Sequence, residues 1–163
     1  MDMLDEELIS FWKSLNQYEV KYIMIGGFAV NLYGFARTTG DIDIWLKDEI
    51  NNKKKLGKAL EQFGYDQLTF EDLNFVPGWT DFYIGGGIRL DIITTMIGLE
   101  NISFEEALSH ASVADIFDIK VPFLHINQLI KNKKATNRPK DIIDVIELEK
   151  IVKIQSEQNK TPD

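Results

Sequence analysis

Cysteine is absent from the 163-residue sequence, and histidine occurs only twice, as His110 and His125. Without cysteine, the chain has no disulfide framework and no thiolate metal site. The two histidines are not paired at ligand spacing, so we expect each to be structural or to lie at a helix end. Long apolar runs are also lacking, because none approaches the roughly 20 residues needed to cross a bilayer.

The first residues, MDMLDEEL, are acidic and do not resemble a signal peptide. Together with the missing cysteine and the missing apolar runs, this composition predicts a cytoplasmic protein that has no membrane partner.

Positive charge is in short supply, with 18 Lys and Arg residues against 26 Asp and Glu residues and a formal net charge of −8. Proteins that bind long nucleic acids usually carry a basic surface, because neutralising phosphates supplies most of their affinity. An extended duplex partner is therefore not expected. Two local basic clusters, Lys53-Lys54-Lys55 and Lys131 to Lys140, are compatible with a smaller anionic ligand.

Hydrophobic periodicity and turn residues predict a single domain over residues 1–155, followed by a polar tail over residues 156–163. Helices are expected at Leu4–Tyr18, Phe28–Tyr33, Ile50–Phe63, Phe104–Ser109, His125–Lys134 and Pro139–Ile154. Strands are expected at Tyr22–Ile25, Ile42–Leu46, Thr80–Ile84 and Ile88–Thr94, with one or two more within Val113–Val121, and Asp66–Gly78 is expected to be irregular. This order predicts an α/β (α+β) domain with a small mixed sheet, helices packed on one face, and C-terminal helices closing over a site.

Two aspartates share one face of a predicted strand. Asp41 and Asp43 alternate with isoleucines, so their side chains point to the same side of the sheet. Neighbouring carboxylates raise each other's pKa unless a cation lies between them, and Mg²⁺ prefers such oxygen ligands. Asp91 lies in a similar alternating run, IRLDIITTM, and is the candidate third acid.

A phosphate-binding element precedes these acids. Gly26 and Gly27 end a buried strand and open a helix, where backbone N–H groups and the helix dipole favour an anion. Glycine lets a phosphate approach the main chain closely. Arg37 could add a planar cation to the same phosphates, or it could instead pair with Asp41 or Asp43.

In these motifs the chain resembles the DNA polymerase beta-like nucleotidyltransferase superfamily, in particular its small bacterial members. The resemblance rests on Ile25-Gly26-Gly27, on Asp41-Ile42-Asp43, and on Leu90-Asp91-Ile92. The segment NKKATNRPKDIID, from Asn132 to Asp144, is also similar to a C-terminal helical motif of those small members. The resemblance covers roughly residues 20 to 150 and implies the nucleotidyltransferase fold.

The resemblance implies that a nucleoside triphosphate donates its nucleoside monophosphate to a hydroxyl-type acceptor on a small molecule, a protein or an RNA end. Asp41 and Asp43 would hold two Mg²⁺ ions, or Mn²⁺, and Asp91 would bind the ion that activates the acceptor. Gly26 and Gly27 would hold the triphosphate.

Further roles follow from the same resemblance. Lys133, Arg138 and Lys140 would reach the nucleotide or the acceptor, and Asp141 would orient one of these cations. Many members carry serine where this chain has Gly27, so one hydrogen bond to the triphosphate is missing, at a cost of roughly 0.5–1.5 kcal/mol.

Two alternative functions stay open at this point. A member of the same superfamily could act with a cognate partner protein, as one half of a toxin–antitoxin pair. A glycosyltransferase could use Asp-x-Asp to hold a nucleotide sugar, but that motif normally ends a strand, whereas Asp43 is followed by Ile44-Trp45-Leu46.

Overall fold

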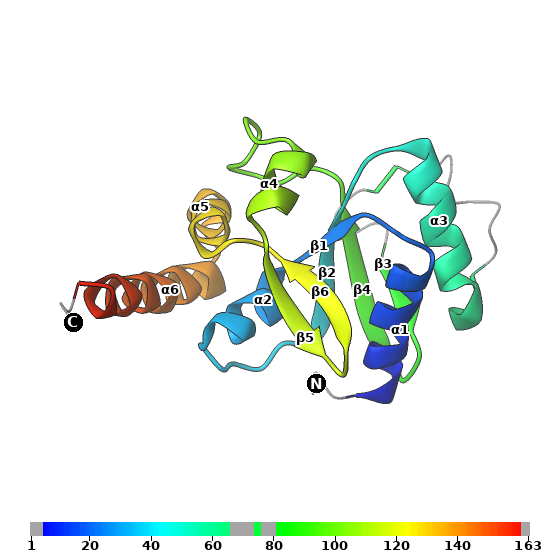
Figure 1. Cartoon of the computed structure of the whole chain (residues 1–163), viewed down its shortest axis with the longest axis horizontal. Coiled ribbons are helices and arrows are strands. Elements are labelled where there is room, and N and C mark those ends of the chain that lie inside the picture. Colours follow the sequence, from blue (N-terminus) through cyan, green and yellow to red (C-terminus); the bar gives the residue numbers. More distant parts are fainter. Residues whose placement is uncertain (1–4, 66–73, 76–80, 161–163) are drawn as a thin grey trace.

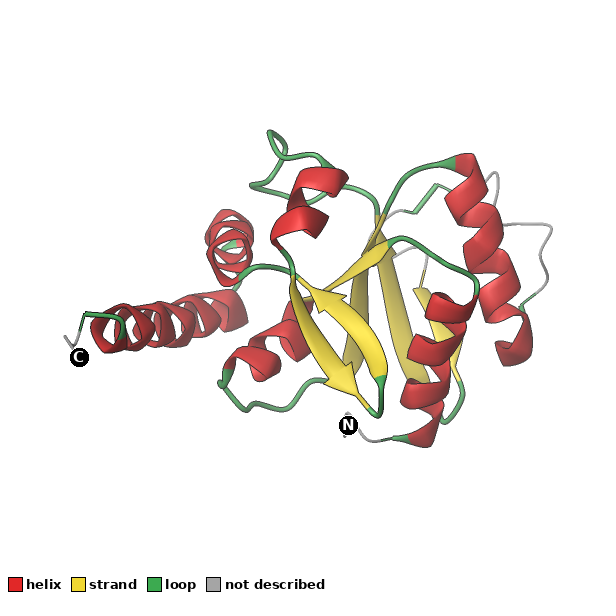
Figure 2. Cartoon of the chain, in the orientation of Figure 1, coloured by secondary structure: helices red, strands yellow, loops and turns green. Residues whose placement is uncertain are grey.

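The computed structural model describes residues 5–65, 74–75 and 81–160. In these residues, six strands form one mixed sheet in the order β3-β4-β2-β1-β6-β5, with helices around it (Figures 1 and 2). Most of the segment predicted to be irregular, Asp66–Gly78, lies outside the described residues.

The observed elements match the predicted order. The strands are β1 (Tyr22–Ile25), β2 (Asp41–Leu46), β3 (Asp81–Ile84), β4 (Ile88–Ile93), β5 (Ser112–Ile116) and β6 (Ile119–Phe123). The helices are α1 (Glu6–Gln17), α2 (Gly26–Tyr33), α3 (Ile50–Leu60), which continues as the 3₁₀ helix η1 (Glu61–Phe63), α4 (Phe104–His110), α5 (Ile126–Thr136) and α6 (Pro139–Gln158). Both histidines lie at helix ends, as predicted, because His125 caps α5 and His110 ends α4.

The sheet places distant segments side by side. Strand β1 pairs antiparallel with β2 and parallel with β6, while β2 pairs parallel with β4. Strands β3 and β4 form a hairpin, since they pair antiparallel across the turn Gly85-Gly86-Gly87. Because β2 and β4 are direct neighbours, the motifs around Asp43 and Asp91 meet at the centre of the sheet.

Helices cover both faces of the sheet, so the expectation of helices on one face is wrong. Tyr22 stacks on Trp12 of α1, with ring centroids 5.6 Å apart, and is paired in register with Leu46. Leu46 therefore points to the same face of the sheet as Tyr22. Trp45 precedes Leu46 on β2 and so points to the opposite face, where its ring contacts Phe104 of α4 edge-on. Figure 2 shows the two helical layers. The short β1 strand, buried along its length, is consistent with a sheet covered on both sides.

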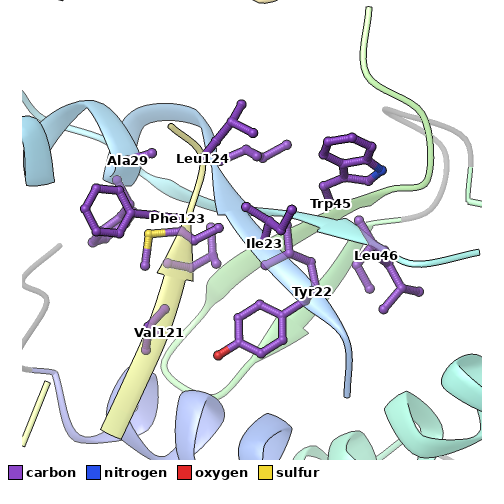
Figure 3. Close-up of a cluster of buried hydrophobic side chains, with 14 of the residues drawn as sticks. Tyr22, Ile23, Ala29, Trp45, Leu46, Val121, Phe123 and Leu124 are labelled. Carbon is purple, nitrogen blue, oxygen red and sulfur yellow. The ribbon is translucent and has the colours of Figure 1, made fainter. Parts of the chain in front are cut away.

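The apolar core surrounds β1 and extends through both layers (Figure 3). Ile23, Leu46 and Val121 of three adjacent strands are all fully buried, and Ala29 and Leu124 extend the cluster to α2 and the start of α5. This packing fixes the end of β1, from which α2 begins, relative to β2 and its aspartates.

The C-terminal helices α5 and α6 contact each other, and α6 extends away from the sheet (Figure 1). Helix α6 ends at Gln158, four residues beyond the predicted end at Ile154 and within the segment predicted as a tail. Among the helices of the described residues, none is both long enough and apolar enough to cross a membrane.

Candidate active site

Three aspartates face one cavity. In the parallel β2–β4 pair, Asp43 lies opposite Asp91 and Asp41 lies opposite Arg89. Residues in register on neighbouring strands point to the same face, so Asp41, Asp43 and Asp91 share one side of the sheet. All three line a cavity of about 920 Å³.

The carboxylates on this face of the sheet repel one another. Burial and the neighbouring charges of Asp91 and Asp41 raise the pKa of the Asp43 carboxyl from 3.8 to about 6. The ammonium groups of Lys133 and Lys140 act in the opposite direction but do not cancel this effect. A cation beside Asp43 would therefore be favourable.

Asp91 also has a cation close by. Its Oδ2 lies 3.6 Å from a guanidinium nitrogen of Arg89, two residues earlier on β4. Within the described residues, no three acidic or histidine side chains are already arranged as a metal centre. A metal bound by all three aspartates would therefore require some rearrangement of these side chains.

The two glycines form the first turn of α2 rather than a loop before it, so the helix starts two residues earlier than predicted. Gly26 has a φ of 70°, a left-handed conformation that favours glycine. A Cβ at Gly26 would lie 2.8 Å from the carboxyl carbon of Asp43 and closer still to its Oδ2. The helix N-terminus and the aspartates are thus in van der Waals contact, with no room for a side chain between them.

A second wall of the cavity is cationic. Arg37 does not pair with Asp41 or Asp43. Instead it donates from Nε and Nη2 to the two carboxylate oxygens of Asp144 on α6, at 2.7 and 2.8 Å. Asp144 is fully buried and also pairs with Lys133 of α5, at 2.8 Å. One buried carboxylate therefore holds Arg37, the predicted phosphate ligand, and Lys133, which was predicted to reach the nucleotide or the acceptor.

Asp141 organises the junction of α5 and α6. It accepts hydrogen bonds from the hydroxyl of Thr136 and from the backbone and side chain of Arg138, which satisfies the expectation that it orients a cation. Burial by itself would raise the pKa of the Asp141 carboxyl, but the hydrogen bonds from Arg138 and Thr136 outweigh it and hold the pKa well below its usual range.

All nine site residues named from the sequence line the same cavity. They are Gly26, Gly27, Arg37, Asp41, Asp43, Asp91, Lys133, Arg138 and Lys140. The C-terminal helices contribute one wall, as predicted.

Two contributors were missed in the sequence. Asp144 was included in the C-terminal motif without a role, although its spacing of three from Asp141 places both acids on one helix face. Arg89 was also missed, although its position two residues before Asp91 puts both side chains on the same strand face.

No family model matches the chain, and no curated protein matches it in sequence. Solved structures do match in fold. The lincosamide antibiotic adenylyltransferase LnuA, determined with lincomycin bound, superimposes with a TM-score of 0.59 at 19% identity, over 90% of this chain and 97% of that chain.

Two further structures are similar. ANT(2″)-Ia in complex with adenylyl-2″-tobramycin gives a TM-score of 0.58 at 18% identity, over 91% of this chain and 92% of that one. TM1012 from Thermotoga maritima, assigned as a nucleotidyltransferase, gives 0.57 at 15% identity, over 94% and 91%. The chain therefore has the fold of these nucleotidyltransferases, which is the fold that the resemblance of its motifs implied.

Proposed function

We propose that this protein is a nucleotidyltransferase that moves a nucleoside monophosphate from a nucleoside triphosphate to a hydroxyl group, with release of pyrophosphate. The observation that carries the proposal is the cavity itself. It combines three aspartates on one face of the sheet, a helix that begins with two glycines, and a wall of lysine and arginine side chains. A triphosphate bound with divalent cations requires carboxylates to bind the cations and positively charged groups to bind the phosphates.

The donor set fits magnesium. Three carboxylates on one face supply hard oxygen ligands, and the raised pKa of Asp43 reflects negative charge that a cation would offset. Asp41 and Asp43 would hold two Mg²⁺ ions, or Mn²⁺, with Asp91 at the one nearer the acceptor. Bound there, the ions would polarise the phosphates and lower the pKa of the acceptor hydroxyl.

The chain's own groups would position the donor. Helix α2 begins at Gly26 on the lining of the cavity, and the N–H groups of its first turn would suit a phosphate oxygen. Arg37 and Lys133 would stabilise the charge of the β- and γ-phosphates, because Asp144 holds both cations and both line the cavity, with Arg37 next to Gly27. Lys140 and Arg138, at the start of α6, would contact the outer part of the nucleotide or the acceptor.

The transfer itself requires one bond exchange. The acceptor oxygen forms a bond to the α-phosphorus while the bond from that phosphorus to the bridging oxygen breaks, and pyrophosphate leaves with that oxygen. The hydroxyl proton must be lost. The carboxylate of Asp91 would receive this proton or pass it to water.

The acceptor class is proposed from the similar structures. LnuA, an adenylyltransferase, was determined with lincomycin, and ANT(2″)-Ia with adenylyl-2″-tobramycin, so we take a hydroxyl of a small molecule as the acceptor and ATP as the donor. A small-molecule alcohol is therefore the first acceptor class to test, ahead of a protein side chain or an RNA end. Asp41 and Asp43 lie inside β2, which continues to Leu46, and this placement does not favour a glycosyltransferase.

The test is release of pyrophosphate from each nucleoside triphosphate in the presence of Mg²⁺ and a panel of alcohols, with separate panels of protein and RNA acceptors. We expect Asp43→Asn and Asp91→Asn to lower turnover by at least about 100-fold, because each removes a ligand for a catalytic ion. Asp48→Asn, on an exposed loop beside Lys53, is the matched control and should retain activity. Transfer that persists in the two site variants would contradict the proposal.

The toxin–antitoxin alternative is a member of the superfamily that binds a cognate partner protein, and such a member can also retain the catalytic chemistry. It predicts that a second, different chain co-purifies with this one, whereas the small-molecule proposal predicts that none does.

A further inference from the structure

One face of α6 is exposed and unusually apolar. Ile143 and Ile154 are 55% and 54% exposed, and Ile142 and Ile146 beside them are also exposed. The buried residues of this helix lie on its opposite side, where Asp144 contacts Arg37 and Lys133. Figure 1 shows the C-terminal part of α6 extending away from the sheet. Isoleucines gathered on one side of a projecting helix are typical of an interaction surface.

The exposed face follows a heptad pattern. A stripe with alternating spacings of three and four residues runs along the helix, and we call it the α6 stripe. Its six members are Lys140, Ile143, Glu147, Lys150, Ile154 and Glu157. This spacing keeps a line of side chains on one side of a helix and is the spacing by which paired helices contact each other.

The α6 stripe is complementary to itself when reversed. Read forward it is Lys-Ile-Glu-Lys-Ile-Glu, and an antiparallel copy presents the same series backwards. Lys140 then faces Glu157, Ile143 faces Ile154, and Glu147 faces Lys150. Every position meets either an opposite charge or another isoleucine.

We propose that the α6 stripe binds the α6 stripe of a second copy of this chain, with the helices antiparallel, and forms a symmetric dimer. A two-fold axis between Glu147 and Lys150 makes each pair occur twice, as a closed isologous interface requires. A parallel pairing would instead place Lys140, Glu147 and Lys150 opposite their own like charges, so the sequence selects the antiparallel arrangement.

The pairing is expected to be weak. In the single chain, Glu147 and Lys150 already form an exposed ion pair at 3.0 Å, and such pairs contribute little in water. Affinity would come mainly from burying Ile143, Ile154 and the adjacent Ile146. One helix pair is smaller than the roughly 1,600 Å² of a standard stable interface, so we expect a dissociation constant of about 10–100 µM.

The proposal is independent of the function proposed above, since it depends only on the exposed face of α6. It does reach the cavity at one residue, because Lys140 lines the cavity and is also the first member of the α6 stripe. In the dimer, Glu157 of the second copy would lie beside Lys140.

Analytical ultracentrifugation from about 1 µM to about 500 µM would test the dimer, and charge exchange would test its register. Glu147→Lys and Lys150→Glu each place like charges at the centre of the pair, so each variant alone should be monomeric over this range. A mixture of the two variants restores opposite charges and should form a heterodimer with about the wild-type affinity.

Lys58→Glu is the control, since it makes the same charge change as Lys150→Glu on an exposed site of α3 and should dimerise like the wild type. Circular dichroism would verify that each variant folds. A wild type that stays monomeric at the highest concentration, or a mixture that shows no heterodimer, would overturn the proposal.

Discussion

Gly26 and Asp43 contact each other more closely than any side chain at position 26 would allow. A Cβ at Gly26 would lie 2.8 Å from the Asp43 carboxyl carbon, and the φ of 70° there adds backbone strain for other residues. This contact couples the start of α2 to the carboxylate of Asp43, so a change at Gly26 would disturb both.

Gly26→Ala should therefore impair the site more than the fold. We expect activity to fall by about 100-fold or more, because the new methyl group displaces Asp43, measured as pyrophosphate release. Gly34→Ala is the control: Gly34 ends the same helix with a φ of 118°, but its nearest atom is 4.0 Å away. Both variants should lose about 1 kcal/mol of stability from the backbone, and only Gly26→Ala should lose activity. Equal activities of the two variants would contradict this role.

Asp43 should destabilise the metal-free protein at neutral pH. Its folded pKa of about 6 exceeds the unfolded value of 3.8, so the penalty is absent below about pH 4, grows up to about pH 6, and is complete above that. Asp43→Asn should raise the free energy of unfolding at pH 7.5 by about 1–2 kcal/mol, a value discounted because the side chain is partly exposed.

The measurement is urea denaturation with a chelator present, at pH 4 and at pH 7.5. The gain should disappear at pH 4, where the wild-type carboxyl is protonated. Asp48→Asn, on the surface, should show no such pH-dependent gain. Adding Mg²⁺ at pH 7.5 should stabilise the wild type more than Asp43→Asn. A variant less stable than the wild type at pH 7.5 would refute this assignment of the pKa.

At the scale of elements, the α5–α6 pair is attached to the sheet by buried charge. Asp144 of α6 is fully buried and accepts from Arg37, which precedes β2 and is 21% exposed, and from Lys133 of α5. A buried carboxylate of this kind balances two cations that would otherwise repel each other across the junction.

Asp144→Asn should lower the free energy of unfolding by about 2–4 kcal/mol, since it leaves Arg37 and Lys133 without their shared negative partner. Chemical denaturation at pH 7.5 would measure the loss. Glu149→Gln is a matched control, because Glu149 also lies on α6 and pairs with the neighbouring lysine, Lys134, but on the surface. Its effect should stay within about 0.5 kcal/mol. Similar losses in the two variants would contradict a role for burial.

The turn between β5 and β6 is suboptimal in sequence. Phe117 and Asp118 have φ values of 48° and 64°, a conformation that a two-residue hairpin usually fills with asparagine and glycine. Phe117 is also 66% exposed, so its ring adds little packing. Phe117→Asn should therefore stabilise the protein by about 0.5–1 kcal/mol, detected by urea denaturation. Tyr83→Asn, an exposed aromatic residue on β3, should give no gain, and a loss at Phe117 would show that the ring packs.

The elements differed in how well the sequence predicted them. The Asp41-Ile-Asp43 alternation and the Gly26-Gly27 pair are local patterns. The structure has the two aspartates on a strand and the two glycines at the junction of a strand and a helix, as expected. The pairing of Arg37 with Asp144 joins residues 107 positions apart, and no local pattern encodes it. The end of α6 was also missed, because Gln155 to Gln158 are polar and give no apolar period, although they continue the helix.

At the scale of the whole molecule, the fold was predictable from element order and motif spacing. The coverage of both sheet faces was not, because β1 and β2 are short and their alternation does not reveal how many layers surround them. The identity of the acceptor was also beyond the sequence.

Binding of MgATP should stabilise the whole domain through contacts between the protein and the phosphates of the nucleotide. At a concentration of MgATP 100 times its dissociation constant, binding adds about 2.7 kcal/mol, which corresponds to a rise of roughly 5–10 °C in the melting temperature of a chain of 163 residues. Differential scanning fluorimetry would measure the shift. Adenosine with Mg²⁺ lacks the phosphates and should give a much smaller shift at the same concentration. Equal shifts would argue against the proposed phosphate site.

The order of charges along the chain has a consequence for biosynthesis. All three aspartates of the cavity have been translated once the ribosome reaches Asp91. Lys133 and its partner Asp144 are translated at least 40 residues later. A nascent chain thus carries the acidic half of the site before the ribosome has supplied most of the basic half. A product released early, after β6, would contain all three carboxylates and lack Lys133 and Lys140, whose positive charges act on Asp43.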